Sequence, residues 1–184
     1  MIGFLTNQQL SKIGFKSLGH NVLISDKASI YGAEKINIGS NVRIDDFCIL
    51  SGDITLHNYI HISAFSALYG RFGIELFDFT GLSPRSTVFS ASDDFSGQFM
   101  ISPMVPDELT QLESGKVVLE KFAQVGAGSV IMPNLVLAEG TVIAAMSMVK
   151  RSTQSWGIYG GCPAEFLKNR NRNIIELSKN IGNI

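Results

Sequence analysis

The chain has 184 residues, 45% of them hydrophobic, which is enough to bury a sizeable core, and we expect residues 1–184 to form a single domain. Fifteen Lys and Arg residues against sixteen Asp and Glu residues leave a formal net charge of −1, which argues against nucleic acid or an anionic membrane surface as a partner. No stretch approaches the roughly 20 apolar residues of a membrane span. The two cysteines, Cys48 and Cys162, are far apart in the sequence, which argues against a disulfide framework and favours the cytoplasm.

Residues 1–21 precede the regular part of the sequence, and we expect this segment to be helical. From Thr6 to Gly19 the sequence reads TNQQLSKIGFKSLG, and the hydroxyl of Thr6 can cap the first turn of a helix. We therefore expect a short N-terminal helix before the repeats begin.

Ile, Leu or Val recurs at every sixth residue in long phased runs between residues 24 and 149. All seventeen phased positions carry one of these three residues, far more than chance produces. Such short-period self-similarity is the sequence signature of a stacked β-solenoid. We therefore expect residues 22–163 to form an all-β, left-handed parallel β-helix of hexapeptide repeats. The phased positions are Ile24, Ile30, Ile38, Ile44, Leu50, Leu56, Ile62, Leu68, Leu76, Leu82, Val88, Leu119, Val125, Ile131, Leu137, Ile143 and Val149.

Two features of the repeat predict where its coils turn. The phase slips by two residues between Ile30 and Ile38 and between Leu68 and Leu76, and a solenoid can absorb such insertions at its corners. Four residues after many of the aliphatic positions stands a small side chain, which we expect to turn inward near a corner. These positions include Ala28, Cys48, Ser66, Thr80, Ser86, Ala123, Ser129, Thr141 and Ser147.

The repeat is interrupted between Asp93 and Gly115 by a polar, irregular stretch. We expect residues 93–115 to leave the coil as a loop. Long loops without structure of their own are uncommon in compact domains and are often functional, so this one is a candidate binding site. The alternative is a tolerated insertion without a function. After the repeats, residues 164–184 read as a C-terminal helix, because Pro163 is a helix start signal.

Three segments of the chain resemble the hexapeptide-repeat acyltransferases, in particular the galactoside and maltose O-acetyltransferases and their relatives in surface-polysaccharide pathways. The segments are INIGSNVRIDDF, VVLEKFAQVGAGSVIMPNLVLAEGTVIAAMSMVK and WGIYGGCPAEFLKNR. The resemblance covers nearly the whole chain. It implies a homotrimer with active sites in clefts between adjacent coils, acetyl-CoA as co-substrate along the outside, and an acceptor near the protruding loop.

The same resemblance implies which residues contact coenzyme A. Gly126, Ala127 and Ala145 match positions along the pantetheine arm, Lys150 and Arg151 match positions near the phosphates, and Lys168 matches a terminal basic contact. Small residues allow close approach and cations suit phosphate, so the chemistry agrees with the match. Glu165 stands where the family has an Arg, which departs from the pattern. The alternative is a solvated basic end made by Lys150, Arg151, Lys168, Arg170 and Arg172.

The resemblance also locates a candidate catalytic position. Asp93 stands where the galactoside and maltose enzymes place a catalytic His, so the usual base is replaced. Asp93 and Asp94 are candidates for accepting a proton or for binding the acceptor. An exposed Asp has a pKa near 3.9 and is a poor base, but an amine acceptor needs a strong base less than a hydroxyl does. The alternative for the pair is a loop-start turn or cap.

His61 is the third candidate catalytic residue. It follows the phased position Leu56 by five residues, as Asp93 follows Val88, so both should point outward near a corner on different faces of one subunit. In a trimer, His61 of one chain could meet Asp93 of its neighbour. The alternative is a structural His, which is also how we interpret His20 and His57.

Other conspicuous residues have more ordinary interpretations. Asp45 and Asp46 are expected to be turn residues that could line the acceptor end of the cleft, and Trp156 and Tyr159 to pack the last coil. No spacing predicts a metal site, and a metalloenzyme of the γ-carbonic-anhydrase type would need three His ligands where the coil has only His57 and His61.

The sequence therefore predicts an acetyl-CoA-dependent acetyltransferase. Its acceptor would be a hydroxyl or amine of a sugar or nucleotide sugar, in surface-polysaccharide or lipopolysaccharide biosynthesis. The competing interpretation is a structural or binding β-helix subunit without catalysis, because a fold does not dictate a function.

Overall fold

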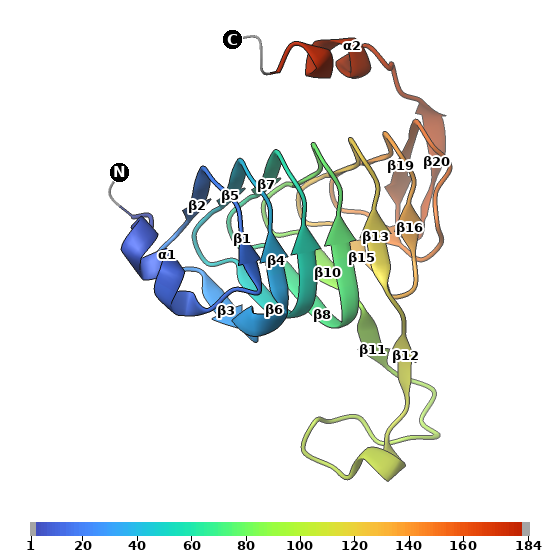
Figure 1. The fold of residues 1–184 in the computed structure, drawn as a ribbon. Coiled ribbons are helices and arrows are strands. Elements are labelled where there is room, and N and C mark those ends of the chain that lie inside the picture. Colours follow the sequence, from blue (N-terminus) through green and yellow to red (C-terminus); the bar gives the residue numbers. More distant parts are fainter. Residues whose placement is uncertain (1–2, 182–184) are drawn as a thin grey trace.

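The computed structural model describes residues 3–181, which form a parallel β-helix whose coils stack along one axis (Figure 1). The strands fall into three sets of parallel neighbours, called faces 1, 2 and 3. Face 1 contains β2 (Val22–Ile24), β5 (Val42–Ile44), β7 (Ile60–Ile62), β9 (Gly81–Leu82), β14 (Gln124–Val125), β17 (Val142–Ile143) and β19 (Gly157–Gly161).

Faces 2 and 3 share two long strands, β6 (Ile49–Leu56) and β8 (Ala67–Leu76), which run along face 2 and continue along face 3. Face 2 is completed by β3 (Ser29–Tyr31), β10 (Thr87–Phe89), β15 (Val130–Ile131) and β18 (Met148–Val149). Face 3 is completed by β1 (Ser17–Leu18), β4 (Ile36–Ile38), β13 (Val117–Leu119) and β16 (Val136–Leu137).

The aliphatic residues that recur every six positions form the buried core. Sixteen of the seventeen phased aliphatic residues are at most 2% exposed, and the remaining one, Ile30, packs against them as a partly buried residue. A second inward column stands two residues earlier on face 3 and consists of Ile36, Ile54, Ile74, Val117 and Leu135. The inward ladder that the sequence predicts is therefore the core of the protein.

The phase slips and small residues lie where the repeat predicts. Between Ile30 and Ile38 the chain makes a short 3-10 turn, η1 (Ala33–Lys35). The second slip falls within β8, which turns between face 2 and face 3 around Gly73, a residue with φ of 97°. Most of the small residues expected to turn inward are buried, among them Ser66, Ser86 and Ser129.

One corner of the coils is lined by a column of stacked aromatic rings. Tyr59 stacks on Phe79 with ring centroids 4.8 Å apart, Phe79 stacks on Phe122 at 5.2 Å, and Trp156 lies 6.0 Å beyond Phe122. All four residues have positive φ, a conformation that costs a residue with a side chain about 1 kcal/mol. Burying Phe122 and Trp156 in this column offsets that cost.

The N-terminal segment confirms the expected cap but contains a shorter helix. Helix α1 (Asn7–Ile13) begins after Thr6, whose hydroxyl accepts a hydrogen bond from the Gln9 backbone N–H, and Leu10 is buried against the first coil. The expectation of helix up to Gly19 was wrong, because Ser17 and Leu18 pair with β4 instead.

The stretch between residues 93 and 115 leaves the coils as a long excursion, as expected (Figure 1). Its two legs pair as a short antiparallel ribbon of β11 (Ala91–Asp93) and β12 (Leu112–Ser114), and its far end holds a 3-10 turn, η2 (Asp107–Leu109). Where the chain returns to the coil, Lys116 Nζ donates to Glu75 Oε2 at 2.6 Å, and His57 Nε2 lies 2.8 Å from Glu75 Oε1. This cluster ties the returning leg to face 3.

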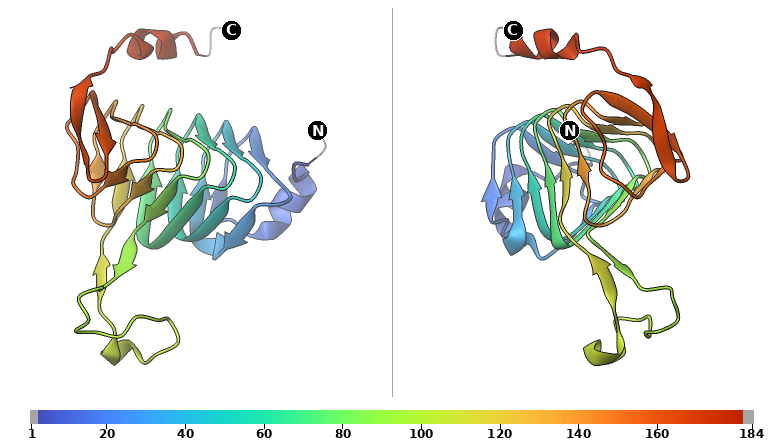
Figure 2. Two further views of the ribbon diagram at one scale, coloured as in Figure 1. Left: turned by 180° about the vertical axis from the view of Figure 1, so that it is seen from behind. Right: turned by 90° about the vertical axis from the view of Figure 1, so that its right-hand side faces the viewer.

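The prediction of one C-terminal helix over residues 164–184 was wrong. Residues Ala164–Asn169 form strand β20, which folds back antiparallel onto β19, and only α2 (Ile174–Lys179) is helical in the part that the structure describes. The start signal at Pro163 was overridden because β19 is the last strand of face 1 and its free edge needs hydrogen-bond partners. Helix α2 extends away from the coils (Figure 2). In residues 3–181 no helix is long and apolar enough to cross a membrane.

The inward ladder can be tested at Leu68, which is fully buried. We expect Leu68→Ala to lower the free energy of unfolding by about 2–5 kcal/mol, because it removes buried methyl groups and leaves a cavity. Urea unfolding followed by circular dichroism measures this change. Val136→Ala on the outer side of face 3, where the side chain is exposed, is the matched control and should change it by less than about 0.5 kcal/mol. Equal effects of the two changes on the free energy of unfolding would contradict the conclusion that the phased residues form the core.

The Glu75 cluster predicts a pH dependence. Partial burial opposes ionisation of Glu75, but hydrogen bonds from His57 and Lys116 outweigh it and hold its pKa below the ordinary value of 4.5. A lowered carboxylate pKa stabilises the fold above the unfolded-state pKa, and that stability is lost as the pH falls through the folded-state pKa. We expect Glu75→Gln to destabilise the protein by about 1 kcal/mol at pH 7, with the difference from wild type disappearing as the pH falls through the lowered, folded-state pKa of Glu75.

Thermal unfolding at a series of pH values checks this expectation. Glu113→Gln on the exposed ribbon is the control, because no ion pair involves Glu113 among residues 3–181. A destabilisation by Glu75→Gln that stays the same as the pH is lowered from 7 until the carboxylates are protonated would show that charge is not its cause.

Candidate active site

A column of short side chains runs along the coils directly after the strands of face 1. Each member donates its backbone N–H to a carbonyl of the next face-1 strand, at 2.8–3.0 Å, which holds these positions above one another. The column consists of Ser25, Asp45, Ser63, Ser83, Gly126 and Ala144. We call it the small-residue column.

Three of the predicted coenzyme A contacts lie together beside this column. A Cβ on Gly126 would lie 2.5 Å from the Ala145 backbone nitrogen, so only glycine allows the two coils to approach. The carbonyl of Ala127 accepts a hydrogen bond from the Met146 backbone at 2.8 Å, which places Ala127 and Ala145 on adjacent coils. In residues 3–181 neither the Ala127 N–H nor the Ala145 N–H donates a hydrogen bond, so both are available to a ligand.

The predicted basic contacts separate into two groups. Lys150 and Arg151 line a cavity of about 330 Å³ together with Pro163, Ala164 and Glu165. Lys168 lies instead on β20, opposite Ile158 of β19, and does not line that cavity. The structure therefore brings Lys150 and Arg151 together with Glu165, the residue that departs from the family pattern.

Two other basic residues of the C-terminal segment contact the coils. Arg170 donates from one nitrogen to the carbonyls of Phe122 and Gly140, at 2.8 and 3.0 Å. The guanidinium of Arg172 lies over the ring of Trp156, 5.5 Å from its centroid. These contacts fasten the chain after β20 to the last coils, as Trp156 and Tyr159 do by packing, while Lys150, Arg151 and Lys168 remain exposed.

Face 1 carries a groove of about 480 Å³ next to the small-residue column, which we call the face-1 groove. It contains His61 and is bounded by Ser63 and Ser83 of the column. Arg43, Tyr59 and Gln124 also line it. In residues 3–181 the Ser83 hydroxyl has no hydrogen-bond partner, which leaves it available to a ligand.

His61 lies in this groove with a carboxylate partner from its own chain. His61 Nε2 is 2.7 Å from Asp45 Oδ2, and Arg43 Nε donates to Asp45 Oδ1 at 2.7 Å. Partial burial of Asp45 opposes ionisation, but the hydrogen bonds from Arg43 and His61 outweigh it and lower its pKa below the ordinary value of 3.8. Asp45 is thus an ionised acceptor for both side chains.

Asp45 and Ser83 are functional candidates whose positions the sequence analysis did not establish. The sequence predicts Asp45 to be a turn residue that could line the acceptor end of the cleft, and it does not distinguish Ser83. The register of the repeats could have identified both residues. Arg43 and His61 pair across adjacent coils, which places them near Asp45. Ser83 follows a face-1 strand directly, as Asp45, Ser63 and Gly126 do. Asp46, by contrast, bonds to Ser25 and Lys27 at 2.6 and 2.8 Å.

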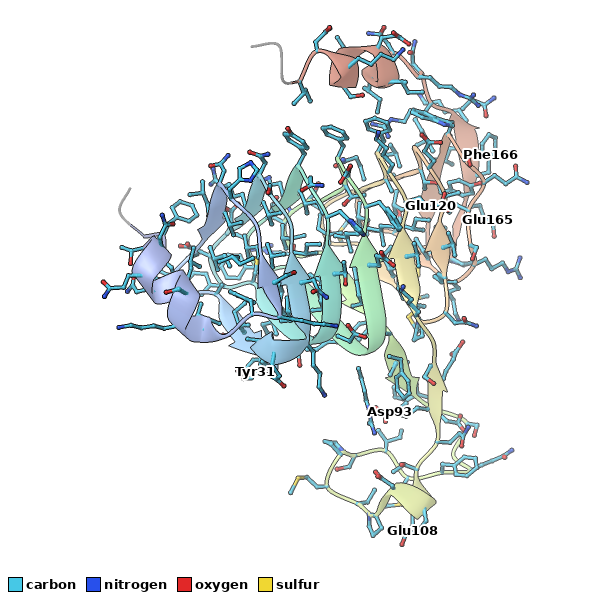
Figure 3. All side chains as sticks on the ribbon, in the orientation of Figure 1. Tyr31, Asp93, Glu108, Glu120, Glu165 and Phe166 are labelled. Atoms are coloured by element: carbon cyan, nitrogen blue, oxygen red, sulfur yellow. The ribbon has the colours of Figure 1, made fainter. Side chains whose placement is uncertain are left out.

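Asp93 lies at the neck of the excursion (Figure 3), in a second cavity of about 270 Å³. Arg71 from the coil, Asp107 from η2, and Ser92 and Thr110 from the two legs also line this neck cavity. In the described part of the chain no group hydrogen bonds to the Asp93 carboxylate. Asp94 is different, because its carboxylate accepts from the backbone and hydroxyl of Ser96 at 2.7 and 2.8 Å and shapes the loop.

Within one chain, His61 and Asp93 do not meet. His61 lines the face-1 groove and Asp93 lines the neck cavity, and the two cavities share no residue. This arrangement agrees with the expectation that they belong to different faces. Among residues 3–181 no three His, Cys, Asp or Glu side chains gather as metal ligands.

Comparison with known proteins decides the family. No protein-family model matches the chain. Over 179 residues, 96% of the chain and 93% of the relative, it is 41% identical to the dTDP-4-amino-4,6-dideoxy-D-glucose acyltransferase of Escherichia coli. The chain belongs to the hexapeptide-repeat sugar acyltransferases. The predicted fold class and the prediction of an enzyme that acylates a sugar are confirmed.

The chain is also similar to two further proteins, AntD and WbbJ. AntD, an N-acyltransferase from Bacillus cereus, is 49% identical, with a TM-score of 0.97 over 100% of this chain and 98% of AntD. AntD structures contain dTDP with coenzyme A or with 3-hydroxybutyryl-CoA, and two variants contain dTDP-4-amino-4,6-dideoxyglucose with coenzyme A. The putative lipopolysaccharide O-acetyltransferase WbbJ of E. coli K12 is 26% identical over 80% of the chain and 76% of WbbJ.

Proposed function

We propose that this acyltransferase moves an acyl group from acyl-coenzyme A to the amine of a dTDP-linked 4-amino-4,6-dideoxy sugar. The observation that carries the choice of an amine is the unpaired carboxylate of Asp93 in the neck cavity, with a second carboxylate, Asp107, in the same lining. These two carboxylates outnumber Arg71, the one cation that residues 3–181 contribute to the lining, and favour a cationic ammonium or an N–H donor over a neutral hydroxyl. The E. coli relative and AntD act on or bind a sugar of this kind.

Coenzyme A is proposed to lie along the C-terminal part of the small-residue column, from Ala144 to Gly126. Lys150 and Arg151 at the C-terminal end suit its phosphates, and the free N–H groups of Ala127 and Ala145 suit the amide carbonyls of the pantetheine arm. From Gly126 the column continues to Ser83, so a thioester carried along it would reach the face-1 groove. Gly126 supports this path by keeping the coils close together.

The volume of the face-1 groove limits the size of the acyl group that it can hold. An acetyl group would occupy a small part of a space of about 480 Å³, so the proposal includes short acyl chains with a polar substituent. AntD has been crystallised with such a chain, 3-hydroxybutyryl-CoA. The Ser83 hydroxyl is positioned at the border of the groove to donate to the thioester oxygen as negative charge develops on it.

The reaction forms one bond and breaks one. The sugar nitrogen attacks the thioester carbon, the C–N bond forms, the C–S bond breaks, and the proton lost by nitrogen ends on the sulfur of coenzyme A. Asp93 and His61 are the proposed residues that hold the amine and take its proton. Asp94 is proposed to act indirectly, by shaping the loop through Ser96.

A homotrimer is part of the proposal, because a single chain keeps Asp93 and His61 in separate cavities. The excursion and α2 both project beyond the coils (Figure 2), where a neighbouring subunit would contact them. A helix of six residues such as α2 is not stable alone in water, which also favours a partner. A cytoplasmic location is proposed as well, since Cys48 and Cys162 are both free thiols.

The acceptor can be tested by offering two nucleotide sugars with acyl-CoA. We expect acylation of dTDP-4-amino-4,6-dideoxyglucose and none of dTDP-glucose, measured as a mass increase of the sugar nucleotide. Asp93→Asn should lower kcat/KM for the amino sugar by about 100-fold, because an amide carries no negative charge with which to hold the sugar ammonium.

The matched control for this change is Glu108→Gln on the exposed end of the excursion, which should leave kcat/KM unchanged. Acylation of both sugars at equal rates, or full activity of Asp93→Asn, would contradict the assignment of an amine acceptor at Asp93.

The coenzyme A site is tested by isothermal titration calorimetry with coenzyme A. The double variant Lys150→Glu, Arg151→Glu should raise Kd by at least about tenfold, because two cations near the phosphates become anions. Lys12→Glu, Lys16→Glu at the N-terminal end of the coils changes the charge equally and should leave Kd unchanged. An equal loss of affinity in both double variants would indicate only a long-range charge effect.

A further inference from the structure

Asp45 connects two outward-facing side chains that belong to adjacent coils. Arg43 and His61 are cross-strand partners on β5 and β7, so both point away from the core on face 1. Asp45, two residues after Arg43, turns toward both of them and uses a different carboxylate oxygen for each, with both distances at 2.7 Å. The carboxylate side chain is only 16% exposed, whereas His61 is 51% exposed.

The contact with Asp45 determines which nitrogen of His61 carries a proton. An ionised carboxylate has no hydrogen to donate, so Nε2 of His61 must be the donor in this pair. In neutral His61 the lone pair is then on Nδ1. Within residues 3–181 no group hydrogen bonds to Nδ1, and His61 lines the groove that Ser63 and Ser83 border.

Arg43 keeps this arrangement in place. Its Nε donates to the second oxygen of Asp45, and its guanidinium lies over the Phe4 ring, 5.4 Å from the centroid. The carboxylate therefore has one fixed partner that is always charged and one partner that can change protonation. A His that gains a proton on Nδ1 would become a cation beside an anion that is already oriented.

The geometry points to Asp45 as a positioning residue that holds His61 with Nε2–H toward the carboxylate and Nδ1 free to accept the proton of the attacking sugar amine. This inference rests on the proposed function and specifies the proton path within it. The proton leaves the amine nitrogen as the C–N bond forms, resides on Nδ1, and is passed to the coenzyme A sulfur as the C–S bond breaks. Arg43 supports the carboxylate and takes no part in the transfer.

The first test is kinetic and uses Asp45→Asn. We expect kcat to fall about 100-fold while KM for acyl-CoA stays within about twofold, because the change affects the tautomer and orientation of His61 and not the coenzyme A path. Asp46→Asn is the matched control, since Asp46 is the neighbouring carboxylate, bonds to Lys27 and Ser25, and does not line the groove. Its kcat should equal that of wild type.

The second test is a double-mutant cycle. If Asp45 acts through His61, Asp45→Asn in a His61→Ala background should cause no further loss of kcat. A further loss comparable to that of the single Asp45→Asn change would show that Asp45 does not act through His61 and would overturn the inference. So would full turnover by His61→Ala in an enzyme that acylates the amino sugar.

The third test does not depend on turnover. The chain has three His residues, so 15N NMR of His-labelled protein can assign each ring with the help of His20→Ala, His57→Ala and His61→Ala variants. We expect neutral His61 to be protonated at Nε2 in wild type and in Asp46→Asn, and to become a mixture of tautomers in Asp45→Asn. Protonation at Nδ1 in wild type would overturn the inference even if acyl transfer to the amino sugar is confirmed.

Discussion

Parallel stacking of short coils is the constraint on which the rest of the molecule depends. Each coil is too short to bury its own apolar side chains, so a residue at the inward position must lie on the one below it, as Leu50 lies on Leu68 and Leu68 on Val88. The backbone ladder between coils satisfies the polar groups of these strands. Because both requirements repeat every coil, the outward side chains are also held in register.

That register is what assembles the candidate site. Asp45 and Gly126 are 81 residues apart in sequence, yet these two residues, Ser63 and Ser83 all occupy the same position after a face-1 strand. A straight column of short side chains suits a long, extended ligand such as the pantetheine arm. The proposed chemistry then lies at the end of the column, beside Arg43 and His61 on the outer side of β5 and β7.

The sequence predicts the features that follow from the six-residue period. The predictions are wrong where a contact with another part of the chain determines the structure. The ladder, its corners and the excursion were predictable because each follows from the local spacing of aliphatic residues. The segment Ala164–Asn169 favours a helix locally, but the free edge of β19 binds it as a strand. The bonds of Asp45 depend on side-chain directions that the pattern in RIDDF does not encode. The spacing predicts that Asp93 lies at the start of the excursion. It does not predict that Arg71 and Asp107 lie beside Asp93, because that depends on how the excursion folds back.

In the proposed reaction, the carboxylate at position 93 would hold the sugar amine and the imidazole at position 61 would take its proton. A carboxylate attracts an ammonium but is too weak a base to hold its proton near neutral pH. A neutral imidazole accepts that proton but has no charge with which to attract the amine. Since the two side chains lie in separate cavities of one chain, the complete pair requires the excursion of one subunit to approach the face-1 groove of another. Assembly of subunits would then complete the site, and the length of the excursion would be explained by the distance it must reach.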